Sequence, residues 1–161
     1  MEELNGYRKR LVKRYADIAT DFEALITQIP LDDGNKPNDQ RGLSLHRVIA
    51  HLRDVEKQVF LPYFERIWNE DFPSLANDSV SIRESERHNA AEPFATIMEE
   101  YGELRARELN LLEEMPTHAW NRTGRHPRLG VRTLQWFVER SLAHAEYHLH
   151  QLQSQIGKTR V

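Results

Sequence analysis

The sequence contains no cysteine among its 161 residues. This absence excludes disulfide bonds and every metal site built on thiolate ligands, so a transition-metal site has to use imidazole and carboxylate groups. The start of the chain has no apolar segment of the kind found in secretory signals, and no later apolar run is long enough to cross a bilayer. We therefore expect a cytoplasmic protein without a membrane partner.

Positive charge does not exceed negative charge in this chain. Lysine and arginine total 22 against 25 aspartate and glutamate residues, which gives a formal net charge of −3. The basic residues form no block, so the electrostatic footprint of a nucleic-acid-binding protein is missing. The length predicts a single domain spanning residues 1–161, large enough to bury a core of its own.

Four stretches carry apolar residues at steps of three and four, the spacing of an amphipathic helix. Pro30 is expected to end the first, and Ser44 can cap the second. Pro62 is expected to kink the second stretch near its end, and Pro93 suits the first turn of the third. The stretches cover residues 4–29, 45–62, 93–115 and 134–152.

The segments between these stretches, residues 31–42, 71–91 and 116–130, are polar, contain turn-forming residues and show no periodicity, so we expect loops. No strand alternation separates the helical patterns. The sequence therefore predicts an all-α four-helix bundle, an architecture in which metal sites are built from side chains on facing helices.

His144 and His148 lie one helical turn apart on the apolar face of the fourth stretch, so both are expected to point inward. His51 flanks the apolar stripe of the second stretch, about 60° from Val48 and about 40° from Val55. Three imidazoles could thus meet one divalent ion. The pair alone is weak evidence, because eight histidines in 161 residues give roughly 0.4 such pairs by chance, and hydrogen-bonded core histidines are the other interpretation.

Three segments add a family likeness: HLRDVE at residues 51–56, GRHPRLGVRTL at residues 124–134 and HAEYHLHQ at residues 144–151. In this order and separation they resemble the DinB/YfiT-like superfamily of metal-binding four-helix bundles. The likeness extends over nearly the whole chain, from about Leu4 to Ile156, in helix order and loop placement.

The resemblance implies a metal bound by one histidine of the second helix and by two ligands four residues apart on the fourth. Those positions correspond to His51, His144 and His148. Some relatives that use a low-molecular-weight thiol have a carboxylate at the first fourth-helix position, and His144 favours the three-imidazole form. We expect one nickel or zinc ion per chain, and no catalytic side chain is identified beyond these ligands.

Three neutral imidazoles leave a divalent ion with open positions, where a water is acidified or a thiol is held as thiolate. The resemblance therefore implies a metal-dependent enzyme with a small-molecule substrate, either an S-transferase with a small thiol as co-substrate or a hydrolase using water. The alternative is a non-catalytic, stress-related metal-binding bundle whose site is closed by a fourth protein ligand. A helical interaction module without metal is the third interpretation.

Several charged residues have two interpretations. Glu108 occupies an apolar stripe, where a buried carboxylate needs a partner, unless the helix is rotated and the carboxylate is solvated. Arg140, one turn before His144, is the candidate partner, as a structural pair or as a group that binds an acidic substrate. Asp54 either accepts a hydrogen bond from a metal-bound histidine or is surface charge. Glu146 is expected to face the solvent.

The remaining histidines and aromatic residues are assigned plainer roles. His126 lies in the loop that can cover the open end of the site, and it is a weaker ligand candidate. Trp120 and Trp136 are expected to make core or dimer contacts. Three apolar residues off the main stripes suggest a homodimer contact: Val12, Phe60 and Phe64. Four histidines are expected to be ordinary polar residues: His46, His88, His118 and His150.

Overall fold

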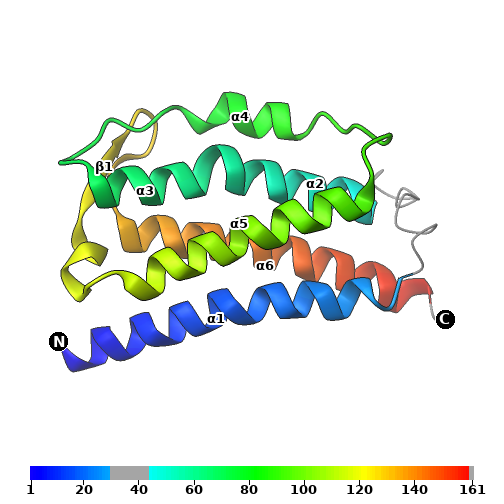
Figure 1. Cartoon of the computed structure of the whole chain (residues 1–161), viewed down its shortest axis with the longest axis horizontal. Helices are drawn as coiled ribbons and strands as arrows, with labels where there is room; N and C mark the ends of the chain where they lie inside the picture. The colour runs from blue at the N-terminus through cyan, green and yellow to red at the C-terminus, as the bar shows by residue number, and fades with distance from the viewer. Residues whose placement is uncertain (30–43, 160–161) are drawn as a thin grey trace.

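The computed structural model describes residues 1–29 and 44–159, and its predominant structure is helical (Figure 1). Pro30 and the predicted loop at residues 31–42 lie outside the described residues. The elements are α1 (Glu2–Ile26), α2 (Leu45–Val55), the π-helical turn η2 (Glu56–Phe60), α3 (Leu61–Asn69), α4 (Asp78–Ser85), α5 (Phe94–Glu114), the 3₁₀ helix η3 (Thr117–Asn121), strands β1 (Thr123–His126) and β2 (Gly130–Thr133), and α6 (Leu134–Thr159).

The predicted four-helix bundle is confirmed. Its helices are α1, the continuous run α2–η2–α3, α5 and α6, and both α1 and α2–η2–α3 contact α5 and α6. Figure 1 shows that the chain returns along the length of the bundle after α3, through the segment that holds α4. As a result α5 runs in the same direction as α2–α3, and α6 runs in the same direction as α1. One long crossover of this kind is an accepted variant of bundle topology.

The apolar stripe predicted for the first helix forms the core over most of its length, and its residues from Leu11 to Leu25 are buried. At the N-terminal end the expectation was wrong, since Leu4 and Tyr7 are exposed. Arg8 is buried there instead, and its guanidinium donates hydrogen bonds to Gln135 Oε1, Thr117 O and Asn121 Oδ1. Arg8, whose guanidinium is hydrogen-bonded to three acceptors, is thus buried where the periodicity predicts apolar side chains.

The second helix begins as predicted and ends later than predicted. Ser44 accepts a hydrogen bond from the Arg47 backbone N–H at 3.1 Å, which satisfies one unpaired donor of the first turn. The helical path continues beyond Pro62 to Asn69, because the turn before it widens into a π-helix, with the Leu61 N–H bonded to Glu56 O. Such π-turns are rare and recur at functional sites.

Two segments expected to be loops contain regular structure. Residues 71–91 include α4, and residues 116–130 include η3 and most of an antiparallel hairpin in which Thr123 pairs with Thr133. The hairpin docks on the bundle where Gly124 lies against Ile67 and Leu75, so closely that an added Cβ would be 3.0 Å from each. A short hairpin with few apolar side chains gives little alternation to read, and for this reason the sequence did not reveal it.

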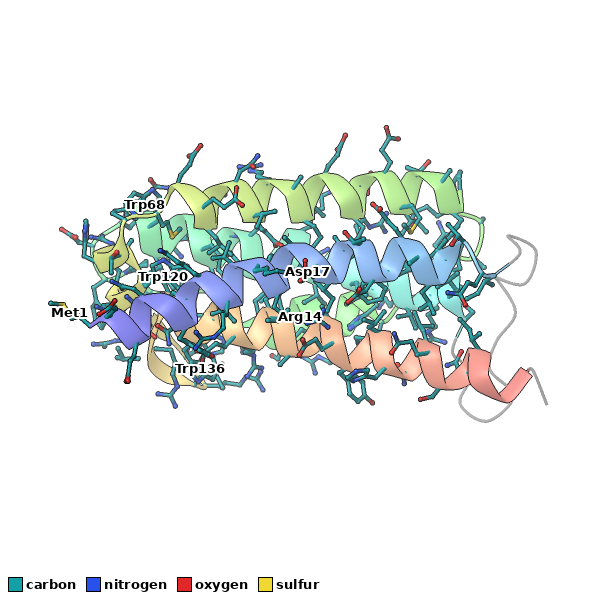
Figure 2. The ribbon with its side chains drawn as sticks, turned by 90° about the horizontal axis from the view of Figure 1, so that it is seen from below. Met1, Arg14, Asp17, Trp68, Trp120 and Trp136 are labelled. Carbon is teal, nitrogen blue, oxygen red and sulfur yellow. The ribbon has the colours of Figure 1, made fainter. Side chains whose placement is uncertain are left out.

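The aromatic residues mostly line the interior. Phe60 and Phe64 are buried in the core and Val12 is partly buried against it, so these residues do not form the exposed apolar surface expected of a dimer contact, and the homodimer stays a prediction. Trp120 is buried and Trp136 is half-buried, and both lie toward the end of the bundle that carries Met1 (Figure 2). None of the described helices combines the length and hydropathy needed to span a membrane.

Candidate metal centre

His51, His144 and His148 converge, as the sequence predicts. One ring nitrogen from each lies within 4.8 Å of the other two, and all three side chains are half-buried. The closest pair is His51 Nε2 and His144 Nε2, at 3.1 Å. Among the described residues, no fourth histidine, cysteine, aspartate or glutamate joins this group.

The two helices that carry these residues explain the convergence. His144 and His148 stand one turn apart on α6, with ring centroids 4.8 Å apart and planes at 88°. His51 comes from α2, and its centroid lies 5.1 Å from each of the other two rings. The rings therefore meet at steep angles with their edges turned to a common point, which is how side chains from facing helices build a metal site.

The electrostatics of the group keep two of its imidazoles neutral. Burial, together with the neighbouring imidazoles, lowers the pKa of His144 to about 3 and the pKa of His148 to about 4. Both rings therefore present lone pairs at neutral pH. Two ring nitrogens at the distance of His51 Nε2 and His144 Nε2 must share a proton or face a common cation, and neutral imidazoles are the form that binds a divalent metal.

His148 is oriented by a neighbour on its own helix. Its Nδ1 lies 3.0 Å from Gln151 Oε1. An amide oxygen only accepts, so Nδ1 carries the hydrogen and Nε2 is left to face the centre. Metal-binding histidines commonly have such a partner. His144 differs, because its Nδ1 is buried and no described group accepts a hydrogen bond from it. The donors present thus suit a divalent transition metal.

Two acidic residues considered as neighbours of the centre make other contacts. Asp54 accepts a hydrogen bond from Arg53 Nε at 2.8 Å, which favours the surface-charge interpretation. Glu146 pairs with Arg14 on α1 at 2.7 Å, on the outer side of α6, so it faces away as expected. The sequence could have revealed Gln151 in place of Asp54, because it lies three residues after His148 on a helix.

A buried polar network lies next to the centre. Glu108 is fully buried, so the rotated-helix interpretation is wrong, and its partner is not Arg140. Tyr15 Oη donates to Glu108 Oε2 at 2.6 Å, and Arg105 lies 3.5 Å from the same oxygen. Sequence analysis missed the contact between Glu108 and Arg105, which lies three residues earlier on α5 and interrupts its apolar stripe.

Glu56 supplies the second carboxylate of this network. It is fully buried in the π-turn after α2, 3.3 Å from the Arg105 guanidinium, and it accepts a hydrogen bond from Ser141 Oγ at 3.2 Å. Burial and the neighbouring Glu56 raise the pKa of Glu108 well above its usual range. One guanidinium then balances one carboxylate, and Glu108 holds a proton. Ser141 is three residues before His144 on α6, so the network borders the centre.

His126 is not a fourth ligand. It is buried in the hairpin, where its Nδ1 accepts hydrogen bonds from the backbone N–H groups of Arg128 and Leu129, both at 3.1 Å. Its Nε2 faces Asp78 Oδ1 at 3.3 Å. Burial lowers the pKa of His126, so the ring is neutral at physiological pH. Its role is to hold the hairpin turn against the start of α4.

The histidines expected to be ordinary polar residues include one pair in contact, formed by the buried His46 and the half-buried His88. His46 is fully buried, and its Nδ1 lies 2.7 Å from His88 Nε2 while its Nε2 lies 2.7 Å from Glu92 O. This pair ties the segment after α4 to α2. Sequence spacing could not reveal it, because the two rings are 42 residues apart.

Comparison with known proteins identifies a family and a similar fold. The family model described as the DinB superfamily matches residues 14–152. No curated protein matches the chain. Among solved structures, YfiT from Bacillus subtilis is similar, with a TM-score of 0.80 at 15% sequence identity over 94% of this chain and 87% of that one. YfiT is described as a probable metal-dependent hydrolase with an unusual four-helix bundle topology.

Proposed function

This chain belongs to the DinB superfamily, and on that premise we propose that it is a metal-dependent hydrolase whose ion is held by His51, His144 and His148. The observation that carries the proposal is the convergence of three half-buried imidazoles from two helices, with one nitrogen of each inside a 4.8 Å group. The description of YfiT as a probable metal-dependent hydrolase supports the reaction class.

The donor set supports an open, catalytic site. Structural zinc sites are closed by four protein ligands, whereas catalytic sites keep a position for water or substrate. Three imidazoles are available here, and no fourth ligating side chain joins them among the described residues. This favours an enzyme over the non-catalytic bundle. A divalent ion bound in this way supplies Lewis acidity and lowers the pKa of a coordinated water.

The residues around the ligands set the conditions for this chemistry. Imidazole ligands bind a metal in their neutral form, so three of them would leave the charge of a bound ion uncompensated. Gln151 fixes the tautomer of His148. Phe60 packs 6.2 Å from the His144 ring, centroid to centroid, and gives the site an apolar neighbour. The buried Glu56–Arg105–Glu108 network borders the ligands, because Glu56 accepts a hydrogen bond from Ser141, three residues before His144.

The experiment is a hydrolysis screen with matched variants. Metal-free protein is loaded with nickel or zinc and assayed against a panel of esters, amides and lactones. We expect turnover that disappears in His148→Ala and persists in His150→Ala, because His150 is an exposed histidine on the same helix. Turnover that His148→Ala leaves intact would contradict the proposal, and no turnover with any substrate would favour the non-catalytic bundle.

A thiol-dependent S-transferase is the second candidate. The observation favouring it is the positive charge of Arg140, one turn before His144, because glutathione and bacillithiol carry carboxylates as well as a thiol. The test measures loss of glutathione, bacillithiol or mycothiol in the presence of an electrophile. Thiol loss that requires both the metal and the electrophile would support this branch, and no loss with reactive electrophiles would remove it.

A further inference from the structure

A buried aspartate at the start of α4 gathers basic side chains beside the metal centre. Asp78 is 2% exposed. Arg128 Nη2 of the hairpin lies 2.7 Å from its Oδ1, His126 Nε2 lies 3.3 Å from the same oxygen, and Arg140 Nη2 of α6 lies 3.8 Å from its Oδ2. The hairpin and α6 thus place two guanidiniums and one imidazole around a carboxylate of α4, which lies 50 residues before Arg128 in the sequence.

The charges of this cluster do not balance. His126 is neutral, because its Nδ1 accepts two backbone hydrogen bonds and burial lowers its pKa. The two arginines therefore face one carboxylate, which leaves one positive charge over among the described side chains. The shorter contact and the hydrogen bond to Asp78 belong to Arg128, so Arg140 is the guanidinium whose charge is left over.

The Arg140 side chain is positioned by protein contacts and is also accessible to a ligand. Its guanidinium carbon lies 5.4 Å from the centroid of the Trp136 ring, one turn earlier on α6, and its side chain is 37% exposed. None of the side chains that the structure describes accepts a hydrogen bond from it. The N–H donors of a purely structural arginine are usually bonded to acceptors of the protein. Those of Arg140 are not, so its planar guanidinium can donate hydrogen bonds to another molecule.

The position of Arg140 relates it to the metal centre. It is four residues before His144 on the same helix, so the two side chains share a face. A small molecule with one end at the three imidazoles can therefore reach the Arg140 guanidinium with its other end.

We propose that Arg140, positioned by Asp78 and Trp136, forms a subsite for a carboxylate of the substrate, next to the centre at which the substrate reacts. A single surplus positive charge matches a singly charged carboxylate, and the guanidinium fork can donate two parallel hydrogen bonds to it. This inference rests on the proposed function, because it assigns the substrate class of the same site. It defines Arg140 as a specificity-determining residue.

The test compares matched pairs of thiols on the cobalt-loaded protein. The probes are mercaptoacetate, 3-mercaptopropionate and 4-mercaptobutyrate, each paired with the mercapto alcohol of the same chain length. Thiolate binding to cobalt produces a charge-transfer absorption, so the dissociation constant of each probe is read directly without any turnover. We expect at least one mercapto acid to bind roughly ten-fold more tightly than its alcohol.

Three variants make the comparison specific. Arg140→Gln should abolish the preference for the acid and leave the affinity for the alcohol unchanged, and Arg140→Lys should keep part of the preference. Arg132→Gln is the matched control, because Arg132 also lies 5.4 Å from the Trp136 ring but makes no contact with Asp78. It should retain the wild-type preference. Cobalt content and melting temperature, measured for each variant, verify that the site is intact.

The outcomes separate this inference from the proposed function. If the wild-type protein bound cobalt and both members of every pair equally, or if Arg140→Gln kept the preference, the carboxylate subsite would be wrong and the metal centre would stand. If the wild-type protein bound no cobalt, both would be wrong.

Discussion

The Nε2 atoms of His51 and His144 lie 3.1 Å apart, although 93 residues separate them in the chain. The crossover through α4 and the packing of α2 against α6 create this contact, and His148 completes the group one turn later. At this distance one ring can donate its N–H to the nitrogen of the other, or both nitrogens can face a common cation. The fold therefore brings together, from two helices, the imidazole donors that a divalent ion requires.

Metal content should depend on His148 and not on its neighbour His150. In His148→Ala the bound nickel or zinc should fall from about one ion per chain towards zero, because two imidazoles retain the ion far less strongly than three. His150→Ala removes an exposed histidine from the same helix and should leave the content unchanged. Elemental analysis of untagged protein after dialysis measures both, and equal content in the two variants would refute the assignment.

Gln151 should tune the metal affinity without being a ligand. Replacing it by leucine removes the acceptor for His148 Nδ1, and the metal affinity should fall roughly 10- to 100-fold, as is usual for such partners. Gln153→Leu changes an exposed residue nearby and serves as the control. Competition with a chelating dye gives the dissociation constants. An unchanged constant in Gln151→Leu would show that the tautomer of His148 is fixed by other means.

The protonated state of Glu108 predicts how stability changes with pH. Its pKa is raised in the folded protein, so its contribution is complete below the unfolded value near 4.3 and is lost as the pH rises, by up to about 1.4 kcal/mol per pH unit. Glu108→Gln mimics the protonated form and removes this loss.

Urea unfolding at several pH values measures the effect of Glu108. The free energy of unfolding of Glu108→Gln should gain on that of the wild type between about pH 5 and about pH 8. Glu114→Gln, which alters an exposed carboxylate on the same segment, should follow the wild type. A constant difference between Glu108→Gln and the wild type across this range would mean that Glu108 is ionised in the folded protein.

Replacement of glycine by alanine should have opposite effects on stability in the closely packed hairpin and on the open face of α5. In Gly124→Ala the new Cβ would lie 3.0 Å from Ile67 and from Leu75, and the free energy of unfolding should fall by about 1 kcal/mol. In Gly102→Ala the new Cβ meets nothing within 4 Å on α5, and stability should rise by about 0.5 kcal/mol. Thermal melting compares the two, and a neutral Gly124→Ala would mean that the hairpin is free to move outward.

Much of this architecture could be predicted from sequence, because long helices carry their own periodicity. The stripes of the four helices, the Ser44 cap and the inward position of His51, His144 and His148 all follow from local spacing. Spacing alone does not decide whether these histidines are metal ligands or hydrogen-bonded core residues. The resemblance to a known family favours metal ligands.

The rest depended on partners that spacing does not reveal. Arg105 and Glu56 are buried because each meets an opposite charge from another helix, and a pattern of apolar residues treats both as surface positions. Arg140 was paired with Glu108 on the basis of charge alone, whereas the crossover brings Asp78 to it. Pro62 was expected to kink the second helix near its end, but the π-turn before it carries the helix on.

The most direct test of the metal centre is X-ray absorption spectroscopy of the zinc-loaded protein. We predict a first coordination shell with three imidazoles and at least one further light donor that does not come from the chain. A first shell with fewer than three imidazoles in the wild type, or one filled by four side chains of the protein, would contradict the account.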